Sequence, residues 1–167
     1  GATQRSLPYG TVIDTKNTLW IVQFGSNIIG HIDQNMKMTE YKLPSADARP
    51  RRVAIDQDDV IWYSDFARGY LGKFDTKTGK FVKEYMSPSG PKSEPYGITV
   101  LNGIVWYAEG NSKPNGLVRF DPKTETFQTF PIPSSGGVVR NIEPTADGKG
   151  IAMAMSAQDK VGIAYIQ

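Results

Sequence analysis

The sequence contains no cysteine and a single histidine in 167 residues. Without cysteine, disulfides, thiolate metal sites and a cysteine nucleophile are excluded. No apolar run is long enough to cross a bilayer, and no stretch reads as a signal peptide. The net charge is only +2 with 22% charged residues, so neither nucleic acid nor a membrane is expected as a partner. A cysteine-free chain of this kind suits a bacterial protein that is periplasmic or secreted, which is the location that we expect.

Sustained helical spacing is also missing, and the chain carries an internal repeat instead. Three tryptophans, Trp20, Trp62 and Trp106, recur at steps of 42 and 44 residues in similar surroundings. A weaker fourth copy has Ala152 at the tryptophan position. The copies span about residues 9–44, 51–88, 96–133 and 140–167, which together form one propeller region over residues 1–167. A period of this length is typical of four-stranded propeller blades.

Each full copy divides into four short segments of alternating polarity, separated by turn residues such as Asn102-Gly103. The predicted fold class is all-β: a propeller built of four four-stranded blades, part of a larger six- to seven-bladed ring or of an assembled ring. We expect the tryptophans to pack between neighbouring sheets, and Gly30 and Gly72 to permit close approach of the blades. The aspartates that follow the third segment of each copy are expected to form turns: Asp33, Asp75 and Asp121.

The fourth copy is shorter than the others. It stops after its third segment, so its outer strand is missing, and residues 1–8 match only the linker between blades. Because an open edge strand promotes aggregation, we favour a larger propeller whose other part supplies the missing strand and further blades. The alternative is a small four-bladed ring, or a ring completed by a second copy of the chain. The remaining blades of the same propeller, or a second copy, are therefore expected partners.

The repeat resembles that of the streptogramin B lyase (virginiamycin B lyase) family of propellers. The resemblance rests on LWIVQFGSNIIGHID with TEYKLP, on IWYSDF with LGKFDTKTGK, and on PYGITV with NGIVWYAEG. It implies a seven-bladed ring and, in true lyases, a magnesium-assisted elimination that opens a cyclic depsipeptide ester. It also implies a histidine in the entry motif, where this chain has Tyr96 within Pro-Tyr-Gly-Ile. The one histidine, His31, falls on a strand position that we expect to be exposed, because the other copies have Lys73 and Arg119 there. No catalytic residue is assigned.

Two positions of every copy converge on one face of the central channel, because the innermost strand of a blade begins at the rim where the second strand ends. The residues at these positions are mostly polar or aromatic, and we predict that they bind a ligand: Tyr9, Gln23, Arg51, Asp65, Tyr96, Glu109 and Arg140. Such a rim suits an anionic or hydrogen-bonding small molecule, glycan or peptide. The alternative is that the arginines and acids of the rim pair with each other.

Glu109 and Asp65 are also candidate ligands of Mg²⁺, since both offer hard carboxylate oxygens. Glu109 ends a Trp-Tyr-Ala-Glu segment that matches the family's repeat, in which acids hold magnesium. We expect a streptogramin-lyase-like propeller that acts as a ligand-binding or scaffold module through its channel rim. The alternative is a magnesium-assisted C–O lyase or hydrolase acting on a cyclic ester or lactone, which needs a base that this chain does not contain. Whether the protein is an enzyme therefore stays open.

Overall fold

The computed structural model describes residues 3–135 and 137–166, and the last residue of the fourth predicted copy, 167, lies outside them. The first sheet contains β1 (Pro8–Ile13), β2 (Leu19–Gln23), β3 (Ile28–Ile32) and β4 (Met38–Lys42). The second contains β5 (Pro50–Ile55), β6 (Val60–Asp65), β7 (Tyr70–Asp75) and β8 (Lys80–Met86). The third contains β9 (Pro95–Leu101), β10 (Ile104–Glu109), β11 (Gly116–Asp121) and β12 (Thr126–Pro131). The fourth contains β13 (Val139–Pro144), β14 (Gly150–Met155) and β15 (Lys160–Tyr165), with a short 3₁₀ helix, η1 (Ser156–Gln158), between the last two.

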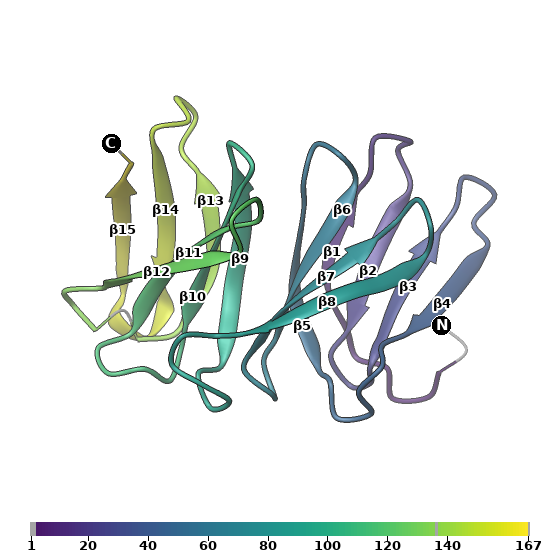
Figure 1. The fold of residues 1–167 in the computed structure, drawn as a ribbon, viewed down its shortest axis with the longest axis horizontal. Coiled ribbons are helices and arrows are strands. Elements are labelled where there is room, and N and C mark those ends of the chain that lie inside the picture. Colours follow the sequence, from purple (N-terminus) through teal and green to yellow (C-terminus); the bar gives the residue numbers. More distant parts are fainter. Residues whose placement is uncertain (1–2, 136, 167) are drawn as a thin grey trace.

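The four sheets are the blades of a β-propeller, as the repeat predicts. Within each blade the strands pair antiparallel in chain order, so every connection is a hairpin. The innermost strands β1, β5, β9 and β13 contact one another in that order, and the blades stand side by side along the chain, with the first and the fourth at opposite ends of the row (Figure 1). The fourth sheet has three strands where the others have four, as its shorter copy predicts.

The tryptophans pack between blades, which confirms their predicted role in the core. Trp20, Trp62 and Trp106 are 2%, 1% and 5% exposed. A phenylalanine from the next blade packs on each of the first two rings: Phe74 lies 5.7 Å from Trp20 and Phe120 lies 5.7 Å from Trp62, measured between ring centroids. Large aromatic side chains bury much apolar area, so these junctions contribute a major part of the stability of the blade stack.

Aspartates hold the turns of the repeat, as the sequence predicts. The side chain of Asp33 accepts the backbone N–H of Asn35 at 2.9 Å, and Asp75 and Asp121 repeat this bond in their own blades. A second turn links the first two strands of a blade. There Asp14 accepts the indole N–H of Trp20 at 2.9 Å and the Thr18 hydroxyl at 2.6 Å, so the same carboxylate closes the turn and orients the core tryptophan.

The glycines that bring blades together are not the predicted ones. A Cβ atom at Gly72 would lie 2.0 Å from the Tyr63 ring of the same blade, so this glycine makes room for a side chain within its own sheet. Close approach between blades occurs instead at the innermost strands. A Cβ atom at Gly10 would lie 3.0 Å from the backbone oxygen of Arg51, and one at Gly97 would lie 3.1 Å from that of Val139. The sheets converge toward the channel, which is why the space is smallest there.

No helix in the described part of the chain is long and apolar enough to span a membrane.

Candidate functional site at the channel rim

The innermost strands begin where the second strands end, as predicted from the repeat. Pro8 pairs with Gln23, Pro50 with Asp65, Pro95 with Glu109 and Val139 with Met155, and each of these pairs is followed by a shift in register. A backbone hydrogen bond then ties the residue after the second strand to the chain just ahead of the innermost strand. The N–H of Phe24 donates to Leu7 and that of Phe66 donates to Arg49. The bulge turns the start of each innermost strand toward the rim, because the extra residue bends the strand.

Six side chains from the first three blades gather at this rim. We call them the rim cluster: Tyr9, Phe24, Arg51, Arg52, Phe66 and Tyr96. Arg51 lies at its centre, because its guanidinium carbon is within 4.1–5.4 Å of the centroids of four aromatic rings: Tyr96, Phe66, Phe24 and Tyr9. The guanidinium carbon of Arg52 lies 5.1 Å from the Tyr9 ring. Stacked rings hold a planar guanidinium in place and attract its charge.

The two tyrosine hydroxyls of the cluster are hydrogen-bonded to each other at 2.5 Å. Tyr9 is 40% exposed, whereas Tyr96 is 2% exposed. The hydrogen bond from Tyr96 lowers the pKa of Tyr9, with further help from the nearby charges of Arg51 and Arg52, although burial opposes the shift. Burial raises the pKa of Tyr96, and the bond to Tyr9 adds to this. Tyr9 therefore presents the more acidic hydroxyl of the pair at the exposed side of the cluster.

The arginines of the rim do not pair with acids, contrary to the alternative raised from the sequence. Among the residues that the structure describes, none of Arg51, Arg52 and Arg140 takes part in an ion pair. The Nε atoms of Arg51 and Arg52 are buried without a hydrogen-bond acceptor. Arg140 is exposed, and its charge acts on Tyr96 by lowering the pKa of that phenol. The cluster is thus a positively charged, aromatic surface whose charge has no carboxylate partner in the described chain.

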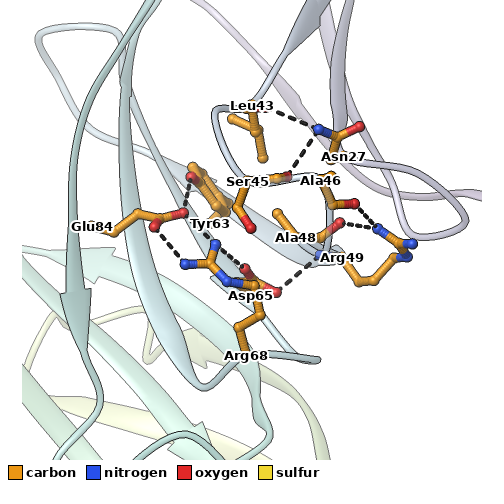
Figure 2. Close-up of polar contacts among 10 residues, drawn as sticks. All are labelled: Asn27, Leu43, Ser45, Ala46, Ala48, Arg49, Tyr63, Asp65, Arg68 and Glu84. Atoms are coloured by element: carbon orange, nitrogen blue, oxygen red, sulfur yellow. Dashed lines mark hydrogen bonds and ion pairs between the residues drawn. The ribbon is translucent and has the colours of Figure 1, made fainter.

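Asp65, Glu109 and Gln23, which are predicted to line the rim, form their hydrogen bonds elsewhere. Asp65 is completely buried; it accepts the backbone N–H of Arg49 at 2.9 Å and the guanidinium of Arg68 at 3.1 Å (Figure 2). Burial raises the pKa of Asp65, and the bonds from Arg49 and Arg68 oppose that shift. Arg68 also forms two hydrogen bonds with Glu84 of the outer strand, both 2.9 Å long (Figure 2).

Glu109 and Gln23 are buried in equivalent positions of their blades. Glu109 accepts the backbone N–H of Ser89 at 3.0 Å and the Ser89 hydroxyl at 2.5 Å. Gln23 donates to Glu40 of the outer strand at 2.8 Å. The structure thus brings Tyr9, Arg51 and Tyr96 together but turns Gln23, Asp65 and Glu109 toward the loops and outer strands.

Sequence reasoning missed Phe24, Phe66 and Arg52. Each phenylalanine comes one residue after a predicted rim residue, and because neighbouring residues of an extended chain point to opposite sides, the phenylalanine faces the rim while the predicted residue faces away from it. Arg52 was missed because strict alternation would place only one of Arg51 and Arg52 at the rim. The register shift at the start of the innermost strand allows both to reach the rim rings. An aromatic residue directly after the second strand in two copies was the signal that could have identified these positions.

The buried polar residues position the cluster. The linker between the first two blades runs from Leu43 to Arg49, and Asn27 donates to the carbonyls of Leu43 and Ser45 at its start, each at 2.9 Å (Figure 2). At its end Asp65 binds the N–H of Arg49, two residues ahead of Arg51 (Figure 2). Both ends of the linker are fixed by buried side chains, so the strand that carries Arg51 starts at a defined place.

The described residues do not fit a magnesium site. Asp65 and Glu109 lie in different blades, and each is fully buried and already accepts two protein donors. In residues 3–135 and 137–166 no group of three or more histidine, cysteine or acidic side chains is placed to hold a metal ion. His31 lies away from the rim cluster: it stacks on Trp20 at 4.3 Å and its Nε2 lies 2.7 Å from the Thr18 hydroxyl. It is half-buried rather than on an open strand face.

Comparison with known proteins agrees with the fold. The sequence model of the Virginiamycin B lyase family matches residues 2–166. The structure is similar to that of a virginiamycin B lyase from Staphylococcus aureus, with 29% identity and a TM-score of 0.79 over 98% of this chain and 57% of that one. A catalytically inactive form of that enzyme with quinupristin gives 23% identity and a TM-score of 0.79, covering all of this chain and 58% of that one.

A more distant structure, a 6-phosphogluconolactonase candidate from Bacteroides uniformis, shares only the fold, with 15% identity and a TM-score of 0.74 over 95% of this chain and 50% of that one. No curated protein matches the sequence significantly. The chain spans a little over half the length of the lyase structures that it resembles.

Proposed function

Because the chain belongs to the virginiamycin B lyase family, we propose that it is a ligand-binding propeller of this family that takes an anionic small molecule, glycan or peptide at its channel rim. One observation carries the proposal: Arg51 and Arg52 lie over the rings of Tyr9 and Tyr96, and neither has an ion-pair partner among the described residues. The exposed Arg140 adds a third charge that is unpaired within the described chain, and this charge lowers the pKa of Tyr96. A periplasmic or extracellular location is part of the same proposal.

The chemistry of the rim cluster favours an oxyanion over a neutral ligand. A guanidinium binds carboxylate and phosphate with paired N–H donors, and charged hydrogen bonds are about twice as strong as neutral ones. The stacked rings fix Arg51 before a ligand arrives, so less side-chain entropy is lost on binding. Tyr9 is 40% exposed and adds a hydroxyl that is bonded to that of Tyr96, while Phe24 and Phe66 supply apolar walls. Such a mixture of apolar walls and a few directed polar groups is usual for small-molecule sites.

A second candidate is the magnesium-assisted opening of a cyclic ester or lactone, which family membership alone favours. The described residues offer neither a metal cluster nor a histidine at the rim. Tyr96 stands at the motif position where the family resemblance implies histidine, and its buried phenol has a raised pKa, which makes it a poor base near neutral pH. This reaction would require groups from outside the described residues, so we rank it second.

Calorimetric titration with three anionic probes, glucuronate, citrate and inorganic phosphate, tests the proposed function. At least one probe should bind, with an affinity that falls as salt is added, because the interaction is electrostatic. Arg51→Gln should weaken that binding by about tenfold or more, since a charged hydrogen bond contributes about 1.5–3 kcal/mol. Lys123→Gln is the matched control, because it removes one positive charge from an exposed turn of the third blade, between β11 and β12.

Two results would count against this function. The first is that none of the probes binds. The second is that Arg51→Gln and Lys123→Gln weaken binding equally, which would indicate a general charge effect rather than a site at the rim.

A further inference from the structure

The two sides of the row of blades differ in charge. Strand pairing places Pro8, Gln23 and Lys42 at one end of the first sheet, and the other full blades repeat this arrangement. The segments that lead into the innermost strands therefore lie on the rim side, together with those that follow the second strands. The β1–β2 and β3–β4 turns and their counterparts lie on the opposite side. Acidic residues outnumber lysines in these turns, as in the β5–β6 turn, Asp56-Gln-Asp-Asp59.

Basic residues predominate in the segments between strands on the rim side. Arg68 is one of them, but Asp65 and Glu84 neutralise its charge (Figure 2). Four others form no ion pair in the part of the chain that the structure describes. We call them the outer cations: Arg5, Arg49, Lys92 and Lys113. The acids of the same segments are fewer: Asp47, Glu94 and Asp159. Positive charge is therefore in excess on this side.

The outer cations lie close to the rim cluster. Arg49 comes two residues before Arg51, and Lys92 comes four residues before Tyr96, so their Cα atoms lie at most about 7 Å and about 14 Å from those residues. The side chain of Asn111 donates to the carbonyl of Lys92 at 2.9 Å, which ties this segment to the loop that carries Lys113. The charge of the rim cluster thus continues outward along these segments.

A single small anion cannot use all of these charges. At physiological salt, exposed charges more than about 8 Å apart are largely screened from each other. An anion held at Arg51 would therefore gain little from Lys92 and Lys113, both of which are exposed. A chain with an anionic group on each unit would instead contact the rim cluster and the outer cations in turn, and each contact would add to the affinity.

The rim cluster favours an acidic glycan over a nucleic acid as this chain. Proteins that bind single strands offer aromatic side chains as separate platforms on which bases stack. Here the rings pack on one another, with centroids 6.1 Å apart for Tyr9 and Phe24 and 5.7 Å apart for Phe66 and Tyr96, and Arg51 lies over all four. The net charge of only +2 is also small for a nucleic-acid-binding domain.

We propose that the rim cluster and the outer cations together bind a linear acidic glycan, with an anionic group on successive sugars, across the rim side of the first three blades. This inference rests on the proposed function, because one anionic group of the glycan occupies the site at Arg51. The outer cations then determine how strongly a long chain is preferred over a single sugar acid.

Calorimetric titration with galacturonate and with its linear tetramer and octamer tests the inference. The octamer should bind about tenfold or more tightly than galacturonate, with the tetramer between them. The slope of log affinity against log salt concentration should steepen with chain length, because each further cation that meets a carboxylate releases counter-ions. This comparison needs only the parent chain, so it decides even if a variant fails to fold.

Two double variants locate the contact. Lys92→Gln combined with Lys113→Gln should weaken binding of the octamer about three- to tenfold, as expected for two exposed charge contacts. It should change the affinity for galacturonate by less than about twofold, because that ligand reaches only the rim cluster. Lys77→Gln combined with Lys123→Gln is the matched control. It removes the same charge from exposed turns on the opposite side of the second and third blades, and it should bind both ligands as the parent does.

The inference would be overturned if the octamer bound no more tightly than galacturonate, or if the two double variants weakened its binding equally. Either result leaves the proposed function standing provided that Arg51→Gln still weakens the binding of a small anion. If Arg51→Gln leaves the binding of every ligand unchanged, the site at the rim fails and the inference fails with it. Tighter binding of single-stranded octathymidylate than of the octamer would identify a nucleic acid as the partner and would also overturn the inference.

Discussion

Replacing Phe120 by alanine should separate the contribution of the buried blade junctions from that of surface aromatics. Phe120 is 0% exposed and its ring lies 5.7 Å from Trp62, 4.6 Å from Tyr85 and 4.7 Å from Phe127. Truncation would remove the ring and leave a cavity walled by three aromatic side chains, which relax little because each is held by its own strand. Phenylalanine-to-alanine changes in such sites cost about 3–5 kcal/mol.

Phe130→Ala is the matched control for this prediction. Phe130 has the equivalent place to Tyr85 in the next blade, but it is 45% exposed and stacks on Trp106 alone, at 6.2 Å. Its truncation should cost about 1 kcal/mol or less, within the range measured for single aromatic pairs. Urea unfolding followed by tryptophan fluorescence measures both free energies. The slope of the unfolding free energy against urea concentration should be the same in both variants and the parent if each unfolds as one unit.

The reasoning would be refuted if Phe120→Ala cost no more than Phe130→Ala. That result would mean that the blades are held together mainly by their backbone hydrogen bonds and by contacts at the innermost strands, and that the ring between them is dispensable.

Three further predictions concern titration and metal binding. Burial alone would raise the pKa of Asp14, but the hydrogen bonds that its carboxylate accepts, among them that from the Trp20 indole, lower the pKa below 3.8. Asp14→Asn should therefore lower the free energy of unfolding by about 1–3 kcal/mol at neutral pH. Urea unfolding should show that the difference between variant and parent shrinks as the pH falls through and below 3.8. In an ultraviolet titration at 295 nm, one of the eight tyrosines should ionise ahead of the others, and Tyr9→Phe should abolish that first step, whereas its survival would exclude Tyr9 as the acidic phenol bonded to Tyr96. Glu109→Gln should lower the melting temperature, because it weakens the buried contact between Glu109 and the loop at Ser89. Millimolar Mg²⁺ should leave the melting temperature of the parent unchanged. A rise with Mg²⁺ that is lost in Glu109→Gln would instead support a magnesium site at Glu109.

The sequence predicts the strands, turns and buried tryptophans of the blades well, because the same pattern of residues occurs in several copies. Trp20 and its counterparts recur at nearly constant steps, and a large apolar residue at a fixed place in each strand pattern can only be buried between sheets. The turn aspartates are equally local, since Asp33 bonds to an N–H two residues away. The three-stranded fourth blade also follows from counting the segments of its copy.

The rim is harder to read from sequence, because its contacts join residues of different blades. Tyr9 and Tyr96 are 87 residues apart, and nothing in either segment indicates that their hydroxyls meet. Asp65 and Glu109 look like rim ligands by alignment, but their carboxylates bond to Arg49 and Ser89, which lie in the linkers that lead from the preceding blade into their own. Aligned copies show which positions vary and do not show to which side each one points.

The sequence by itself determined the architecture of this chain: the all-β class, its four blades, the buried tryptophans and the turns, all of which follow from the pattern that recurs in the repeat. Only the tertiary structure decided which side chains meet around Arg51 and that Gln23, Asp65 and Glu109 point away from them. Those contacts depend on how neighbouring blades are rotated and on a register shift of single residues in each innermost strand. A repeat pattern fixes the period of the chain, whereas a one-residue shift changes the direction in which a side chain points.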